Sequence, residues 1–186
     1  MRIDAYAHVI PREFIAHMRE VHPTEELATA DVPHLYDHEK RLRDLDDHGI
    51  DRQVLTLGRP TMWRGLDPES AFPLVKAAND AVRDYADEHP DRYIPVATLP
   101  FVGDAYLQEF ERCMDMGMAG VQIFSHTGET PVDSAAHRDL YGRVVDHDVP
   151  VWIHPQLWEW QPWDSEYMLH KMFGWPFDTS LAMGRL

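Results

Sequence analysis

The sequence predicts an α/β protein in which one parallel sheet is covered by helices. Strand and helix patterns alternate along all 186 residues, which is typical of repeated strand–helix–strand units. The expected strands hold short, continuous apolar runs such as Val54-Leu55 and Val151-Trp152-Ile153, which suit strands buried on both faces. Hydrophobic residues make up 44% of the chain and charged residues 26%, a globular composition, so we expect a single domain over 1–186.

The first half of the chain gives two strands and three helices. The first strand is expected at 2–8, and Pro11 then opens a helix, because proline is tolerated in a first turn. A helix over 37–48 stops at Gly49, and the second strand, 53–57, follows at once. A long helix over 67–88 has a regular apolar face and ends before His89-Pro90.

The second half repeats this alternation. Strands are expected at 93–99, 119–124 and 149–154, separated by helices at 104–116 and 134–147. The lone Cys113 falls on the apolar stripe of the first of these helices, where core packing is expected rather than nucleophilic chemistry. A single cysteine forms no disulfide within the chain, which fits a reducing compartment.

Charge and composition restrict the expected partners. The formal net charge of -15 argues against nucleic acid. No apolar run approaches the ~20 residues of a membrane helix, and the first residues lack the apolar core of a signal peptide. We therefore expect a cytoplasmic protein that acts on a small molecule, without a membrane or nucleic-acid partner, and a homodimer stays open.

Candidate site residues stand where the strands end, because ligands bind at the carboxyl ends of parallel strands. Asp4, Tyr6 and His8 alternate along the first strand and are expected to share one face, and His154 ends the fifth strand. A single histidine at a strand end is usually a hydrogen-bonded structural residue. Two histidines at matching ends favour a functional site, and Tyr6 stands where a His-x-His metal motif would place its first ligand.

Polar and aromatic residues near the same ends are candidates for substrate contacts. They are Arg59, Trp63 and Arg64 after the second strand, Gln122 on the fourth strand and Trp158 after the fifth. Arginine holds carboxylates well through its planar guanidinium group. These residues predict a pocket for an acidic substrate beside the histidine pair.

Five further histidines lie in acidic stretches and are expected to be solvated: His17, His22, His34, His38 and His48. His34 and His38 are four residues apart and could chelate a metal from one helix face. Tyr36-Asp37 between them indicates a helix start, however, so the surface interpretation is favoured for this pair.

Several segments, taken in order, resemble the amidohydrolase superfamily in the branch of aminocarboxymuconate-semialdehyde decarboxylase. They lie at 3–11, 45–51, 79–80, 89–93, 98–100, 120–123, 151–155 and 174–179. The resemblance implies a (β/α)8 TIM barrel and one divalent metal ion, Zn2+ first with Mn2+ or Fe2+ as alternatives. The resemblance implies that His8 and His154 match metal ligands, and that Tyr6 takes a position where the family has His or Glu. Arg41 is a candidate contact for the substrate carboxylate, but because it stands near a helix start, a surface role is favoured for it.

Two features depart from the family pattern. Neutral tyrosine, with an ordinary pKa of ~10, is a poor zinc ligand. Five strands are predicted where the barrel has eight, so we expect the chain to match the N-terminal five βα units, without the family's sixth-strand His and eighth-strand Asp. No catalytic residue is therefore assigned, and the chain alone is expected to lack a complete active site.

The resemblance leaves three functions open. The first is a metal-dependent decarboxylase, or carboxy-lyase, of a small aromatic or unsaturated carboxylic acid. The second is a metal-dependent hydrolase, lactonase or hydratase of the same superfamily. The third is a non-catalytic barrel homologue that has lost its metal site.

Overall fold

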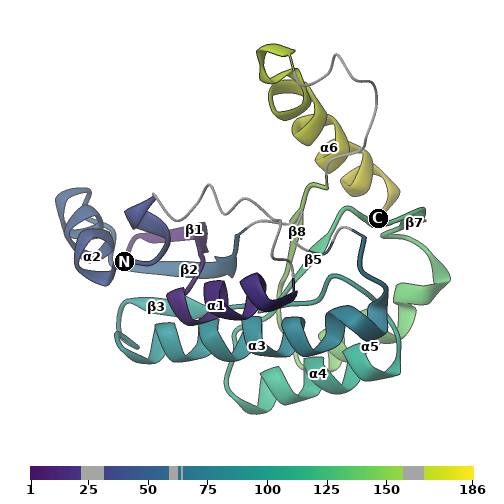
Figure 1. Cartoon of the computed structure of the whole chain (residues 1–186), viewed down its shortest axis with the longest axis horizontal. Coiled ribbons are helices and arrows are strands. Elements are labelled where there is room, and N and C mark those ends of the chain that lie inside the picture. Colours follow the sequence, from purple (N-terminus) through teal and green to yellow (C-terminus); the bar gives the residue numbers. More distant parts are fainter. Residues whose placement is uncertain (22–31, 59–62, 64, 157–165) are drawn as a thin grey trace.

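The computed structural model describes residues 1–21, 32–58, 63, 65–156 and 166–186, and its strands and helices alternate as predicted (Figure 1). The strands are β1 (Ile3–Val9), β2 (Arg52–Leu57), β3 (Tyr93–Pro95), β4 (Ala97–Thr98), β5 (Val121–Phe124), β6 (His126–Thr127), β7 (Thr130–Pro131) and β8 (Val151–His154). The α-helices are α1 (Arg12–Val21), α2 (His38–Asp47), α3 (Pro68–Asp87), α4 (Asp104–Asp115), α5 (Arg138–Asp146) and α6 (Trp175–Arg185). The described residues also include the short 3-10 turns η1 (Pro33–Leu35) and η3 (Ala135–His137) and a π-helical stretch, η5 (His170–Gly174).

The strands pair in parallel in two groups, in the orders β1-β2-β3 and β4-β5-β8. The predicted single strand at 93–99 is divided, because the chain changes its hydrogen-bond partner at this point. The Val96 N–H donates to the Leu55 carbonyl on β2, and the Ala97 N–H donates to the Gly120 carbonyl before β5, each at 3.0 Å. Residues 93–98 therefore connect the two groups. Within each group, neighbouring strands follow one another in the same order as in the sequence.

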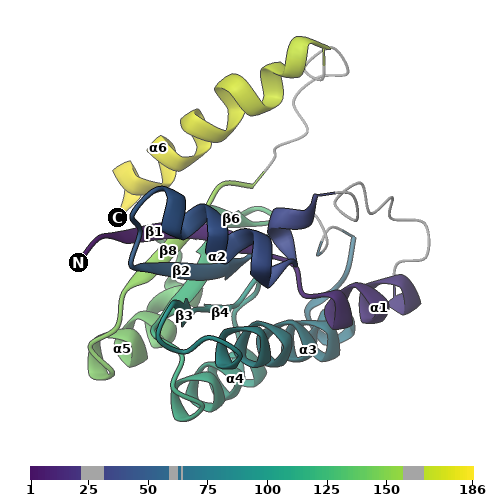
Figure 2. The same ribbon diagram turned by 90° about the vertical axis from the view of Figure 1, so that its left-hand side faces the viewer.

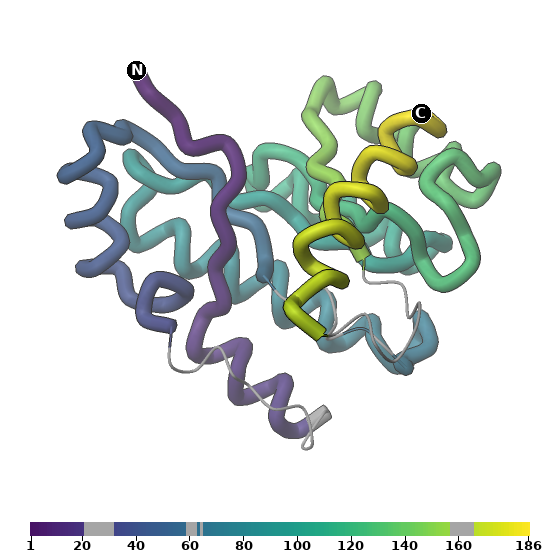
Figure 3. The backbone as a smooth tube through the Cα atoms, turned by 90° about the horizontal axis from the view of Figure 1, so that it is seen from above, coloured from purple at the N-terminus to yellow at the C-terminus, as the bar shows by residue number. Residues whose placement is uncertain are grey.

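Helices α1, α3 and α4 cover one side of the sheet, and α6 lies on the other (Figure 2). Viewed from above, α6 crosses the half of the molecule that contains β5 and β8 (Figure 3). The expected burial on both faces holds for β2 and β5. It holds only in part for β8, where Val151, Trp152 and Ile153 are half-buried, and it fails for β1, where Ile3 and Tyr6 are each 40% exposed. β1 is an edge strand, so fewer elements cover it.

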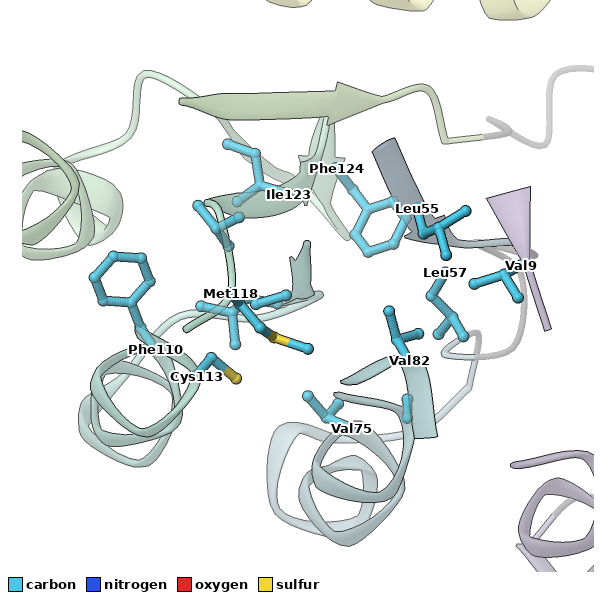
Figure 4. Close-up of a cluster of buried hydrophobic side chains, with 14 of the residues drawn as sticks. Val9, Leu55, Leu57, Val75, Val82, Phe110, Cys113, Met118, Ile123 and Phe124 are labelled. Atoms are coloured by element: carbon cyan, nitrogen blue, oxygen red, sulfur yellow. The ribbon is translucent and has the colours of Figure 1, made fainter. Parts of the chain in front are cut away.

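The core lies between the strands and the inner faces of α3 and α4 (Figure 4). Strand residues such as Leu55 and Ile123 pack there with Val75 and Val82 of α3. Cys113 of α4 is fully buried in this core, as predicted, and burial raises the pKa of its thiol. Within the described ranges no helix is long and apolar enough to cross a membrane.

Candidate metal centre

Two imidazoles and one phenol meet at the carboxyl ends of β1 and β8. The ring centroids of His8 and His154 lie 5.1 Å apart, and those of Tyr6 and His8 lie 5.3 Å apart. β1 and β8 stand at opposite ends of the strand order, so the sheet has to curl for these rings to meet. The indole Nε1 of Trp152 on β8 donates to the Ala5 carbonyl on β1 at 2.8 Å, which links the two edges. The structure thus gathers the three residues that the sequence predicted as ligands.

Hydrogen bonds orient both histidines in the same way. Thr56 donates its hydroxyl proton to the Ala7 carbonyl at 3.2 Å, so its oxygen is an acceptor for His8 Nδ1–H at 2.9 Å. His154 Nδ1 lies 2.8 Å from the Pro155 carbonyl, which can only accept. Each ring therefore carries its proton on Nδ1 and keeps the Nε2 lone pair free, the tautomer that an outer carbonyl or hydroxyl selects in metal-binding histidines.

Burial disfavours the charged form of all three side chains. It lowers the pKa of His8 to about 4, helped by the nearby His154 and Arg41 and opposed by the hydrogen bond to Thr56. Burial also lowers the pKa of His154, against the charge of Asp178. Tyr6 is 40% exposed as a residue, but the partial burial of its phenol beside Gln122 and the two histidines raises the pKa of this group. The centre therefore offers two neutral imidazoles, which are ready ligands, and one protonated phenol, which is a weak one.

Arg41 is buried against β1, so the prediction that it lies on the surface is wrong. Its side chain is 5% exposed and donates to the His8 carbonyl at 2.7 Å, to Gln53 Oε1 at 2.6 Å and to the His34 carbonyl. Gln53 in turn donates to Asp4 at 2.7 Å. The guanidinium group can be buried here because three acceptors meet it, a condition that a helix-start pattern does not reveal.

Gln122 on β5, the middle strand of the second group, contacts Tyr6 at the centre. It is fully buried, its Oε1 accepts from the Tyr6 hydroxyl at 3.3 Å, and its Nε2 donates to the Leu57 carbonyl at 3.1 Å. These bonds fix its amide orientation. Gln122 therefore holds Tyr6 in place and stands beside the predicted ligands.

Helix α6 is anchored beside the centre by a buried carboxylate. Asp178 is 3% exposed, accepts from the Gln156 N–H at 2.8 Å and pairs with the Ser125 hydroxyl. Gln156 stands two residues after His154, so this contact ties α6 to the segment that follows β8. No role was predicted for Asp178 from the sequence, although 174–179 was one of the segments in the family resemblance.

The remaining predicted contacts are distributed differently. Arg59, Arg64 and Trp158 lie outside the described residues. Trp63 is described and is 3% exposed, packed in the hydrophobic core. Of the predicted substrate contacts, Gln122 is the one that the described part of the structure places against a predicted ligand, Tyr6.

Comparisons with known proteins agree on one family. Residues 3–181 match the sequence model of the family described as "Amidohydrolase". Gamma-resorcylate decarboxylase of Rhizobium radiobacter is 32% identical over 139 residues, which are 66% of this chain and 42% of that protein. The 2-amino-3-carboxymuconate-6-semialdehyde decarboxylase of Dictyostelium discoideum is 28% identical over 152 residues, 80% of this chain and 42% of that protein. The chain thus spans less than half the length of these relatives.

Solved structures give the same result. A 2,6-dihydroxybenzoate decarboxylase complexed with 2,6-dihydroxybenzoate superposes with a TM-score of 0.82 at 25% identity, over 100% of this chain and 60% of that one. A 5-carboxyvanillate decarboxylase from Novosphingobium aromaticivorans, with bound manganese, superposes with a TM-score of 0.80 at 26% identity, over 98% of this chain and 60% of that one.

Proposed function

Because the chain belongs to the amidohydrolase family, as its sequence indicated, we propose that His8 and His154 hold a divalent metal ion in a decarboxylase of a small aromatic or unsaturated carboxylic acid. The single observation that carries this proposal is the pair of free Nε2 lone pairs, each selected by an oxygen acceptor at Nδ1. Gamma-resorcylate, 2,6-dihydroxybenzoate and 5-carboxyvanillate decarboxylases among the relatives support the reaction and the substrate class.

The donor set fits a divalent transition metal. Two neutral imidazoles suit Zn2+ and also Mn2+ or Fe2+, and Zn2+ stays our first choice because nitrogen ligands favour it. Manganese in a solved relative makes Mn2+ the first alternative. When bound, such an ion supplies a Lewis acid that polarises a substrate oxygen or a water molecule.

The chain's own residues have three tasks in the proposed reaction. His8 and His154 present Nε2, while Thr56 and the Pro155 carbonyl keep each ring in that orientation. Arg59 and Arg64 are proposed to bind the substrate carboxylate, and Gln122 and Trp158 to complete the pocket. Trp63, which is packed in the hydrophobic core, is proposed to support the pocket wall from within rather than to touch the substrate. In the reaction the bond from the substrate carbon to the carboxyl carbon breaks, carbon dioxide leaves, and the electron pair on the substrate carbon takes up a proton.

The fold proposal goes with the functional one. We propose that β1, β2, β3 with β4, β5 and β8 are the first five strands of a (β/α)8 barrel that forms one domain. TM-scores of 0.82 and 0.80 to decarboxylase chains, of which this chain covers 60%, support this proposal. The proposed partner is a small carboxylated molecule, because a chain with a net charge of -15 repels nucleic acid. We also propose a homodimer, which a measurement of the molar mass in solution would test.

A carbon dioxide assay with defined metals tests the activity. The protein that carries this chain is freed of metal, reloaded with Zn2+ or Mn2+, and supplied with 2,6-dihydroxybenzoate or 5-carboxyvanillate. Carbon dioxide release is expected only with metal, and His8→Gln and His154→Gln are expected to lose both the bound metal and the activity. His48→Gln, at an exposed histidine, is the matched control and keeps both.

The same assay separates the alternatives. Ring opening or water addition without carbon dioxide would favour a hydrolase, lactonase or hydratase. Absence of metal binding at His8 and His154 would favour a non-catalytic homologue, a candidate supported by the protonated Tyr6 at the position of a third ligand.

A further inference from the structure

A second group of possible metal ligands lies away from the β1–β8 centre, where α2 begins and α3 ends. It consists of His38, Glu88 and His89, and one ligand atom from each lies within 4.8 Å of the others. His34, which sequence spacing suggested as the partner of His38, is not a member of this group, and its Nε2 lies 3.0 Å from an Asp44 carboxylate oxygen. The ligands come from two helix ends rather than from one helix face.

Local structure fixes the two histidines. Asp37 caps α2 by accepting from the Lys40 N–H at 3.0 Å, which makes His38 the first helical residue. The His38 ring stacks on Tyr85 of α3, with ring centroids 3.7 Å apart. His89 follows the α3 C-cap and donates its backbone N–H to the Ala86 carbonyl at 3.1 Å. His38 therefore meets the end of α3 through packing, not by a chance surface contact.

The contact between His38 and Glu88 leaves room for a cation. His38 Nε2 and Glu88 Oε2 lie 3.4 Å apart, longer than an ordinary N–H···O bond of ~2.9 Å. The other ring nitrogen, Nδ1, is buried and has no hydrogen-bond partner in the described structure, so no bond fixes the proton on either nitrogen. Burial lowers the pKa of His38, which favours the neutral ring that a metal requires.

The surroundings are acidic and accessible. His38 and Glu88 line a cavity of about 510 Å³ between α1, α2 and α3. Its lining also includes Glu13, Asp80 and Asp84, and Arg12 is the one arginine or lysine among the lining residues. A cation is attracted to such a cavity, and water can fill the ligand positions that the protein leaves open.

We propose that His38, Glu88 and His89 form a second transition-metal site, occupied by Zn2+, that ties the start of α2 to the end of α3. Two imidazoles and one carboxylate make a three-ligand set whose fourth position water can take. Nitrogen ligands favour zinc over Ca2+ and Mg2+, which prefer oxygen. The three ligand atoms lie within 4.8 Å of one another, and the Glu88 side chain, 65% exposed, is free to rotate toward an ion between the two imidazoles.

Calorimetric titration of the metal-free chain with Zn2+ tests the second site separately from the first. His8→Gln with His154→Gln removes the β1–β8 ligands, and this double variant is expected to bind one zinc that also raises its melting temperature. Adding Glu88→Gln or His89→Gln to the double variant is expected to lower its zinc affinity at least about tenfold. Loss of a residue that only hydrogen-bonds to a metal ligand already lowers metal affinity by that much. Glu88 is exposed, so its substitution leaves the fold intact, which circular dichroism verifies.

Two controls decide the outcome. His17→Gln changes a histidine that lines the same cavity but stands outside the triad, and it should leave zinc affinity unchanged. Ca2+ should give no comparable heat. Zinc binding that survives both Glu88→Gln and His89→Gln, or the absence of any zinc in the double variant, would overturn the second site. Neither result bears on the β1–β8 site. Zinc binding at that site is measured separately in the Glu88→Gln variant, in which His8 and His154 are intact.

Discussion

At the scale of single residues, the proposed metal centre turns on Tyr6. His8 and His154 each have a free Nε2 and a bonded Nδ1, so they are complete ligands as they stand. Tyr6 lies beside them, with its ring centroid 6.2 Å from that of His154, but burial keeps its phenol protonated. A protonated phenol contributes little to metal binding at neutral pH, so two imidazoles would carry the affinity.

Tyr6→His is therefore expected to raise the affinity of the β1–β8 centre for Zn2+. The new imidazole restores a His-x-His pair on one strand and adds a third nitrogen ligand, which should strengthen binding at least about tenfold. Competition with a chromophoric chelator measures the change. Tyr6→Phe is the matched control and should bind zinc like the unaltered chain, and a large loss in Tyr6→Phe would show instead that the phenol is a ligand.

Arg41 shows what residue patterns miss at this scale. Its sequence position near a helix start indicated solvent, yet its guanidinium group meets the carbonyls of His8 and His34 and the amide of Gln53. None of these acceptors is close to Arg41 on one helix face, so helical periodicity carries no trace of them. Burial of a charged group depends on partners brought together by the fold.

At the scale of elements, the order of strands and helices could be predicted, because apolar runs and helical stripes are local signals. α3 (Pro68–Asp87) agrees closely with the helix predicted at 67–88, since Asp67 caps it by accepting from the Ser70 N–H at 2.9 Å. The hairpin β6–β7 and the division of the third strand were not predicted. The division depends on hydrogen-bond partners distant in sequence, which a window of neighbouring residues does not contain. The hairpin is local, pairing Thr127 with Thr130, but its two-residue strands are too short to give an alternating pattern.

The first strand shows the same limit. Strict alternation predicted that Asp4 shares a face with Tyr6 and His8, but the register with β2 shifts between Asp4 and Ala7. The Asp4 carboxylate accepts from Gln53, whereas the Tyr6 hydroxyl donates to Gln122. A bulge inserts a residue against the partner strand, and the sequence of one strand alone does not reveal it.

Gly120 tests how closely β5 and β8 approach at their start. Its φ is +158°, and a Cβ there would lie 2.4 Å from the Pro150 carbonyl oxygen and 2.8 Å from the Trp152 ring. Gly120→Ala is therefore expected to lower the free energy of unfolding by at least about 2 kcal/mol, because backbone atoms have to move. Urea denaturation followed by circular dichroism measures the loss.

Gly142 is the matched control for this substitution. It lies in α5, its backbone is ordinary helix, and a Cβ added there would meet no heavy atom within 4 Å outside its own helix turn. Gly142→Ala should raise the free energy of unfolding by up to about 1 kcal/mol, since alanine favours the helix. Equal effects of the two substitutions would contradict the close approach at Gly120.

At the scale of the whole molecule, the proposed centre depends on the curl of the sheet. β1 and β8 are separated by the other strands in the order, yet Trp152 bonds to Ala5 and the two histidines meet. Sequence predicted both strand ends but not how far the sheet bends, because curvature is set by packing across every strand at once. The pair of ligands is thus a property of the assembled sheet rather than of either strand.

The whole molecule is also expected to lose stability in mild acid, because it buries a histidine, His137, away from both proposed metal sites. His137 is 2% exposed and packs near Tyr141, with ring centroids 5.9 Å apart. Burial lowers the pKa of His137 below its ordinary 6.5, although the charge of Asp133 opposes this. The unfolded chain therefore takes up a proton at a higher pH than the folded chain does.

The sign of the pH dependence follows from this difference. The stability that neutral His137 contributes is complete above pH 6.5 and falls as the pH drops through and below that value, where the unfolded state binds more protons. Urea unfolding of the metal-free chain at pH 7 and pH 5 should show a smaller loss for His137→Phe, which keeps a ring but does not titrate. His48→Phe changes an exposed histidine and should lose as much as the unaltered chain. An equal loss in His137→Phe would mean that the ring is protonated in the folded molecule as readily as in the unfolded one.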